Sequence, residues 1–109
     1  MPYQAFNQTF RFMSETAFAV IRRYAQRNPA ITFEELWAEF AGTPIGFHDL
    51  VHRASEQVVI DNPERFSHET ISVSDENNVV VTNQWTSEVF ADFMDYCATL
   101  GDEYRIVEI

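Results

Sequence analysis

The fold class of this chain is decided by residues 70–83, which read TISVSDENNVVVTN. Two alternating runs, 70–74 and 79–83, are rich in β-branched residues and flank the polar, turn-forming run 75–78. This pattern predicts a β-hairpin, so the fold contains an antiparallel sheet.

Helical patterns lie on both sides of the hairpin. Before it, the apolar spacing predicts three helices, at 14–27 with Ser14 as the N-cap, at 33–40 and at 47–59. The second helix begins with Thr32 and Glu35 at the spacing of a capping box, in which the two side chains satisfy free backbone N–H groups reciprocally. After the hairpin, a helix from about Thr86 ends before Gly101. Residues 104–109 are expected to add a short strand to the hairpin sheet.

The order of these elements predicts an α+β fold in a single domain, residues 1–109. Three N-terminal helices plus the β-hairpin are winged-helix-like, and a C-terminal helix and a short strand follow. In that arrangement the second and third helices form a helix-turn-helix and the hairpin is the wing. The aromatic-rich residues 2–12 are expected to be an extended arm or strand that docks on the body. Exchange of this arm between two copies is a hypothesis for a homodimer.

The C-terminal half resembles a known family. Its pattern comprises an Arg-Phe pair at 65–66, Asn83-Gln84-Trp85, Phe93 and Leu100-Gly101. Residues 60–109 thereby resemble a small, poorly characterised bacterial module found with restriction or other DNA-associated proteins. This chain has Thr86 where that module usually has glycine, and it carries an insertion at 102–103. The resemblance implies a DNA-related context and no catalytic residue.

The charge of the chain is strongly one-sided. The formal net charge is −10, there is no lysine, and all seven basic residues are arginines. The first thirty residues hold four arginines and one carboxylate, whereas the remainder holds three arginines and sixteen carboxylates. A body this acidic repels nucleic acid and anionic membranes and attracts basic protein surfaces.

The predicted partner-binding surface is acidic. On the last helix Glu88, Asp92 and Asp95 fall at i, i+4 and i+7, so they share one stripe with roughly 6 Å between i and i+4 side chains. That spacing is comparable to the distance between successive phosphates of a nucleic-acid strand, so the stripe is able to imitate a row of phosphates. Other carboxylates extend the stripe or form a second patch: Asp102, Glu103, Glu35, Glu39, Asp75 and Glu76. The plain alternative is that these groups only solvate the surface.

The second functional hypothesis is a winged-helix DNA-binding transcriptional regulator. Its recognition helix and its phosphate contacts would be supplied by His48, His52, Arg53, Arg22, Arg23 and Arg27. One arginine and two neutral histidines beside carboxylates are a poor set for phosphate contact, so direct binding of nucleic acid is not expected. The arginines are equally explained by surface solubility or by ion pairs with neighbouring acids.

Few residues point to catalysis or to a cofactor. Cys97 is the only cysteine and is expected as a buried, inert thiol on the inner face of the last helix. His48 and His52 have the spacing of one helical turn, but no HExxH motif or paired cysteine accompanies them. We therefore expect no enzyme activity, no cofactor and no metal. Trp85 is expected to pack into the core while the Asn83 amide satisfies backbone groups; a binding pocket at this motif is the alternative.

The sequence thus predicts a small acidic, non-catalytic protein-interaction module. Its concrete form is an inhibitor of the DNA-mimic type, like those of phages and mobile elements. Such an inhibitor occupies a basic surface of a nucleic-acid-binding host defence or DNA-processing protein. No stretch approaches the ~18 apolar residues that a membrane span requires, and no signal-peptide pattern opens the chain. A cytoplasmic protein that does not bind membranes is expected.

Overall fold

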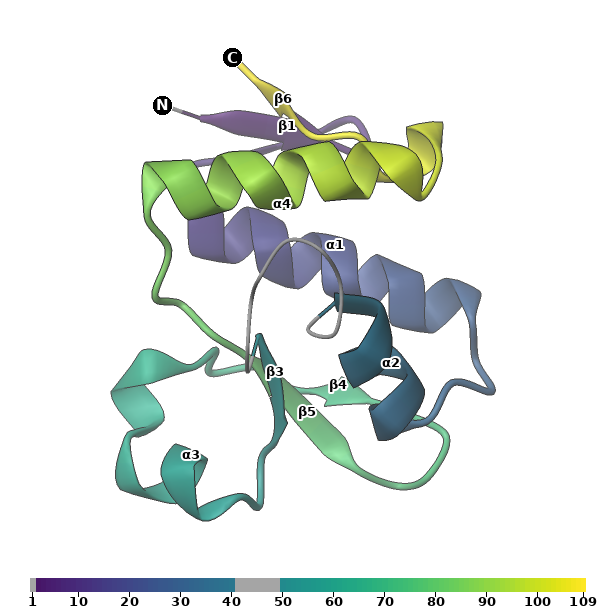
Figure 1. Cartoon of the computed structure of the whole chain (residues 1–109), viewed down its shortest axis with the longest axis vertical. Helices are drawn as coiled ribbons and strands as arrows, with labels where there is room; N and C mark the ends of the chain where they lie inside the picture. The colour runs from purple at the N-terminus through teal and green to yellow at the C-terminus, as the bar shows by residue number, and fades with distance from the viewer. Residues whose placement is uncertain (1, 41–49) are drawn as a thin grey trace.

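Helix α1, Met13–Arg27, lies at the centre of the molecule between two small antiparallel sheets (Figure 1). The structure is a computed structural model, and it describes residues 2–40 and 50–109. The predicted α+β class is confirmed: the described residues form four α-helices and two three-stranded sheets. The predicted N-cap of α1, Ser14, is wrong by two residues, because Phe12 is the N-cap and Ser14 already lies inside the helix.

The first sheet brings the two ends of the chain together. Its order is β2–β1–β6, with bounds Gln8–Phe10, Tyr3–Ala5 and Val107–Glu108. The predicted arm 2–12 is therefore a hairpin that belongs to the body. The C-terminal strand pairs with β1 and not, as predicted, with the central hairpin. The termini lie side by side (Figure 1), and the Ile109 N–H donates to the Pro2 carbonyl at 3.0 Å.

The turn of this N-terminal hairpin holds Phe6 and Asn7 in the left-handed region, with φ of 55° and 61°. Two positive φ values suit the two-residue turns that match strand twist, but a bulky residue there is strained. Contacts of the Phe6 ring offset this backbone strain. The Arg23 guanidinium lies 4.6 Å from its centroid and the Tyr104 ring 6.3 Å away.

The second sheet has the order β3–β5–β4, with bounds Val51–Arg53, Asn78–Val81 and Ile71–Ser72. The predicted hairpin is confirmed as the antiparallel pair β4–β5. The predicted helix at 47–59 is wrong. Residues 51–53 are a strand, α3 spans only Gln57–Asp61, and residues 47–49 lie outside the described part of the chain.

The physical reason lies in the three consecutive valines Val79–Val81. All three are buried, with Val79 and Val81 in the main core and Val80 in a second apolar cluster, so both faces of β5 are covered and its backbone N–H and C=O groups need strand partners at both edges. Residues 51–53 supply the second neighbour. Without a helix at 51–53, the described residues do not form the helix-turn-helix of the winged-helix arrangement, and that arrangement is not confirmed.

Helices α2 and α4, Phe33–Phe40 and Ser87–Thr99, close the aromatic core. The capping box of α2 is confirmed: the Thr32 N–H donates to Glu35 Oε1 at 3.0 Å and the Glu35 N–H to Thr32 Oγ1 at 3.2 Å. At the start of α4, Thr86 caps the helix by accepting from the Val89 N–H. The fully buried rings of the core are Phe40, Phe90 and Phe93. Trp37 of α2 lies outside this core and is 38% exposed.

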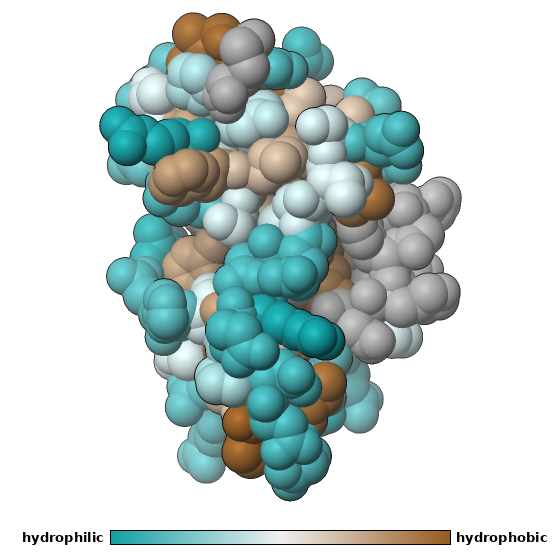
Figure 2. All heavy atoms as spheres, turned by 90° about the vertical axis from the view of Figure 1, so that its left-hand side faces the viewer, coloured by the Kyte–Doolittle hydropathy of each residue, from teal (hydrophilic) through white to brown (hydrophobic). Residues whose placement is uncertain are grey.

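Apolar side chains also reach the surface away from this core. Val58 and Ile60 of α3 are 44% and 58% exposed. Figure 2 shows mostly hydrophilic atoms on one face of the molecule, with apolar atoms at its lower end, the end at which α3 lies in Figure 1.

Short 3-10 helices follow α3 and α4, at Pro63–Arg65 (η1) and Asp102–Tyr104 (η2).

The tip of the β4–β5 hairpin docks on the loop between α1 and α2. The Ser74 N–H donates to the Ile31 carbonyl, and Asp75 Oδ2 accepts the Phe33 N–H at 3.3 Å. Asp75 therefore satisfies a free donor at the N-terminus of α2, where negative charge is also favoured by the helix dipole. Desolvation raises the pKa of Asp75, but hydrogen bonds from Phe33 and Asn77 together outweigh it, so the net pKa is lowered.

This contact gives a pH-dependent contribution to stability. A carboxylate with a lowered folded-state pKa stabilises above its unfolded-state pKa of about 3.9, and the effect is lost as the pH falls through the folded-state pKa. We expect Asp75→Asn to lower the urea midpoint at neutral pH, and this difference from wild type to shrink as the pH falls below about 4.

The control is Glu76→Gln at the neighbouring position, since the Glu76 side chain has no hydrogen bond or ion pair to the described residues. Equal losses in both variants would contradict the capping role of Asp75. So would a loss in Asp75→Asn that is the same at every pH.

Candidate functional site

The three predicted acidic residues of α4 form an exposed row along its outer face. Glu88, Asp92 and Asp95 are all exposed, and none has a hydrogen bond or ion pair with the part of the chain that the structure describes. The row spans about 10 Å along the helix axis. Its exposed neighbours on α4 are small: Ser87, Ala91, Ala98 and Thr99. We call Glu88, Asp92 and Asp95 the α4 row.

The α4 row is unfavourable for the helix that carries it. Aspartate is a poor residue for a helix interior, and carboxylates four residues apart repel one another. Glu88 lies in the first turn, where the helix dipole favours negative charge, but Asp92 and Asp95 lie beyond it. The last turn of α4 has no basic residue to compensate. Helix stability therefore does not explain the two aspartates.

The predicted extension of the row beyond α4 is already neutralised within the molecule. Glu103 Oε1 lies 2.8 Å from Arg27 Nη2 and 3.5 Å from Arg23 Nη1. Asp102 lies 3.8 Å from Arg105 in a pair that is open to water. Such exposed pairs contribute about 0–1 kcal/mol each, but they leave Glu103 less free than the α4 row to bind a partner.

Most of the predicted second patch serves the fold. Glu35 belongs to the capping box and Asp75 caps α2 from the hairpin. The Tyr96 hydroxyl lies 2.9 Å from Glu39 Oε1 and 2.7 Å from the Glu39 carbonyl oxygen, and it donates to this pair of acceptors. This contact joins α4 to the end of α2. Burial raises the pKa of Tyr96, and the hydrogen bond and charge of Glu39 raise it further. Only Glu76 of this patch is without such a role among the described residues.

The residues proposed for DNA reading are not presented as a recognition surface. His52 is buried in β3, with Nδ1 3.1 Å from Glu56 Oε1 and its ring edge-to-face with Phe66. Arg53 lies over the Phe33 ring, 4.1 Å from its centroid. His48 lies outside the described residues, so its helical spacing to His52 has no support.

The three predicted phosphate-contacting arginines of α1 lie against carboxylates. Arg22 pairs with Glu69 at 3.3 Å, and Arg23 and Arg27 share Glu103. These pairs agree with the alternative that sequence analysis left open, in which neighbouring acids neutralise the arginines. A nucleic-acid phosphate would have to displace Glu69 and Glu103.

The Asn83-Gln84-Trp85 segment has the structural role expected of it. The Trp85 ring packs edge-on against Phe90 and Phe93, at 5.3 and 5.0 Å between centroids, and its Nε1–H donates to the Thr82 carbonyl. The Asn83 amide donates to the Glu64 carbonyl at 2.9 Å. The segment thus ties η1 to the start of α4.

Cys97 is buried on the inner face of α4, as predicted, and burial raises the pKa of its thiol. A thiol in this setting stays protonated and is a weak nucleophile. Across residues 2–40 and 50–109, no three or more His, Cys, Asp or Glu side chains gather in a way that could hold a metal ion. No helix in the same part of the chain is long and apolar enough to cross a membrane.

Comparison of the chain with protein-family models, with curated proteins and with solved structures found no match. The resemblance of residues 60–109 to a bacterial module therefore stays a prediction.

The unfavourable position of Asp92 and Asp95 can be tested by stability measurements. We expect Asp92→Gln with Asp95→Gln to raise the free energy of unfolding by roughly 0.5–1 kcal/mol, because glutamine is a better helix former and the repulsion falls. Urea unfolding followed by circular dichroism measures this change. Glu88→Gln is the matched control in the first turn, where removal of the charge is expected to destabilise. A loss of stability in the double variant would show that the two aspartates serve the fold.

Proposed function

We propose that this protein is a non-catalytic interaction module that binds a basic surface of a nucleic-acid-binding protein. In this proposal the α4 row takes the positions of phosphates, so the module competes with nucleic acid for that surface. The partner class is a host defence or DNA-processing protein, and the effect is inhibition. The cell compartment that this implies is the cytoplasm.

The observation that carries the proposal is the exposed α4 row itself. Its three carboxylates have no counterion among the described residues, and two of them weaken the helix. Proteins retain destabilising residues of this kind where those residues serve binding. Small neighbours such as Ala91 and Ala98 leave the carboxylates protruding, so that a flat or concave basic surface can reach all three.

The charge of the whole chain supports the same kind of partner. A net charge of −10 without any lysine gives a long-range negative potential around the molecule. Such a potential speeds the encounter with a basic partner and weakens as salt is added. The three arginines of α1 interrupt it little, because Glu69 and Glu103 offset two of their three charges.

The alternative of a DNA-binding regulator has less support. It needs His52 and Arg53 on an exposed recognition helix, but both lie on strand β3, His52 buried and Arg53 against Phe33. It also needs free arginines on α1. No observation on the described residues favours it over the interaction module.

The experiment is a competitive capture. The immobilised protein is incubated with bacterial lysate, washed, and then eluted with duplex DNA. We expect a nucleic-acid-binding protein to be released by the DNA at constant salt, because both ligands use one basic surface. A variant with Glu88→Gln, Asp92→Asn and Asp95→Asn is expected to capture much less of it.

The matched control carries the same loss of three charges away from α4, as Glu34→Gln, Glu76→Gln and Glu108→Gln. Equal capture by the two triple variants would show that bulk charge, and not the α4 row, binds the partner. Direct retention of DNA by the wild-type protein, with no protein partner, would contradict the proposal and favour the regulator.

A further inference from the structure

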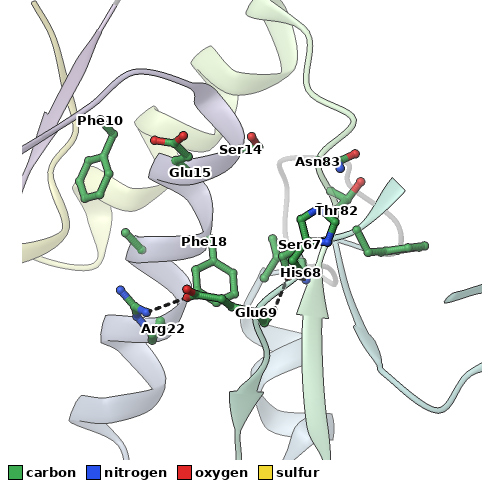
Figure 3. Close-up of a pocket in the computed structure, with 13 residues that line it drawn as sticks. Phe10, Ser14, Glu15, Phe18, Arg22, Ser67, His68, Glu69, Thr82 and Asn83 are labelled. Atoms are coloured by element: carbon green, nitrogen blue, oxygen red, sulfur yellow. Dashed lines mark hydrogen bonds and ion pairs between the residues drawn. The ribbon is translucent and has the colours of Figure 1, made fainter. Parts of the chain in front are cut away.

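A groove runs along α1 on the side of the second sheet. Its first part has a volume of about 450 Å³ and lies between the N-terminal half of α1 and the two segments 66–69 and 81–83 (Figure 3). Phe18 and Phe66 contribute apolar surface to it. The rim is polar: Figure 3 shows Ser14, Glu15 and Arg22 on the helix side, and His68, Glu69 and Asn83 on the opposite side.

The groove continues past Arg22 into a second hollow of about 440 Å³. This part lies between the C-terminal half of α1 and residues 70–74, which include β4. Arg22 lines both hollows, so they adjoin at this side chain along one stripe of the helix. From Ser14 to Gln26 the stripe is about 18 Å long. An extended peptide of five or six residues has about this length.

The two parts of the groove offer different chemistry. The first part offers aromatic surface for apolar side chains. In the second part Gln26, Thr70 and Ser72 carry amide or hydroxyl groups that are unbonded among the described residues. An extended peptide brings one N–H and one C=O per residue, and these need partners when they leave water. A purely apolar ligand would leave the polar groups of the second part unsatisfied.

The charged side chains that line the groove favour a peptide with positive charges. Two carboxylates, Glu15 and Glu69, line the first part of the groove against the single arginine Arg22. Arg22 and Glu69 form an exposed pair across the groove at 3.3 Å, with side chains 45% and 74% exposed. Exposed pairs of this kind are worth about 0–1 kcal/mol, so an incoming cation is able to replace Arg22 at Glu69 at little cost. Glu15 has no partner in the described part of the chain and offers a second anchor.

We propose that this groove binds an extended segment of another protein that carries arginine or lysine together with apolar side chains. The cations pair with Glu15 and Glu69, an apolar side chain lies on the partly exposed Phe10 ring and the exposed edges of Phe18 and Phe66, and the backbone bonds to the polar groups beside β4. None of the residues of the α4 row lines the groove. This inference therefore goes beyond the proposed function, and the two fail separately.

The experiment is a selection of short random peptides displayed on phage against the folded protein, followed by titration of the enriched peptides. We expect enrichment of peptides that combine basic and apolar residues. Their affinity is expected to fall about tenfold or more in Glu69→Arg, which places a positive charge beside the bound cation. The control is Asp92→Arg, an equal change of charge on α4, which is expected to keep binding. Chemical-shift changes in a labelled sample are expected around Phe18, Ser67 and Glu69.

Several results would overturn the proposal. These are the absence of enriched peptides, enrichment of acidic peptides, and equal loss of binding in the two variants. A loss confined to Asp92→Arg would support the α4 row as a binding surface and reject the groove. Light scattering that shows a dimer dissolved by Glu69→Arg would assign the groove to a second copy of the chain. Urea unfolding of Glu69→Arg shows whether the variant is folded, and Glu69→Gln is the milder substitution if it is not.

Discussion

The burial of α1 between the two sheets is the constraint on which the rest of the structure depends. Six consecutive residues, Thr16–Ile21, are buried, so this part of the helix is covered on nearly every side. One side is covered by the sheet that joins the chain ends, and another contacts β4. Side chains of α1 reach water before this run, at Glu15, and after it, where the three arginines meet Glu69 and Glu103. The position of α1 therefore also fixes which charges of the molecule are compensated.

The surface charge follows from this arrangement. Five carboxylates near α1 and α2 bind arginines, cap a helix or hold Tyr96, namely Glu69, Glu103, Glu35, Asp75 and Glu39, whereas the α4 row has no such role among the described residues. An acidic composition alone would explain solubility. A basic partner is indicated because the carboxylates of the α4 row remain exposed without a counterion among the described residues, whereas the other five named here are bound within the molecule. The groove beside α1 adds a second surface that differs in kind, since it combines aromatic side chains with a few charges.

Local signals made part of the fold predictable. The hairpin, the capping box at Thr32, the start of α4 at Thr86 and the burial of Cys97 all depend on neighbours within a few residues. The helix predicted at 47–59 is wrong because residues 51–53 pair with β5, whose buried backbone needs partners at both edges, and this long-range pairing overrides the local helical spacing of apolar residues. The exposure of the α4 row followed from helical periodicity. The pairing of Glu103 with Arg23 and Arg27, and of Asp75 with Phe33, joins residues far apart in the chain, so sequence reasoning could not find it.

Carbodiimide cross-linking of the protein in bacterial lysate tests the central claim most directly. This reagent joins carboxylates to nearby amines, and the chain has no lysine, so cross-links from its carboxylates to lysine must lead to another protein. Mass spectrometry of the products identifies both ends. We expect the cross-linked positions to be Glu88, Asp92 and Asp95, joined to lysines of a nucleic-acid-binding protein and lost when duplex DNA is added. Cross-links spread evenly over the exposed carboxylates, or unaffected by DNA, would contradict the account.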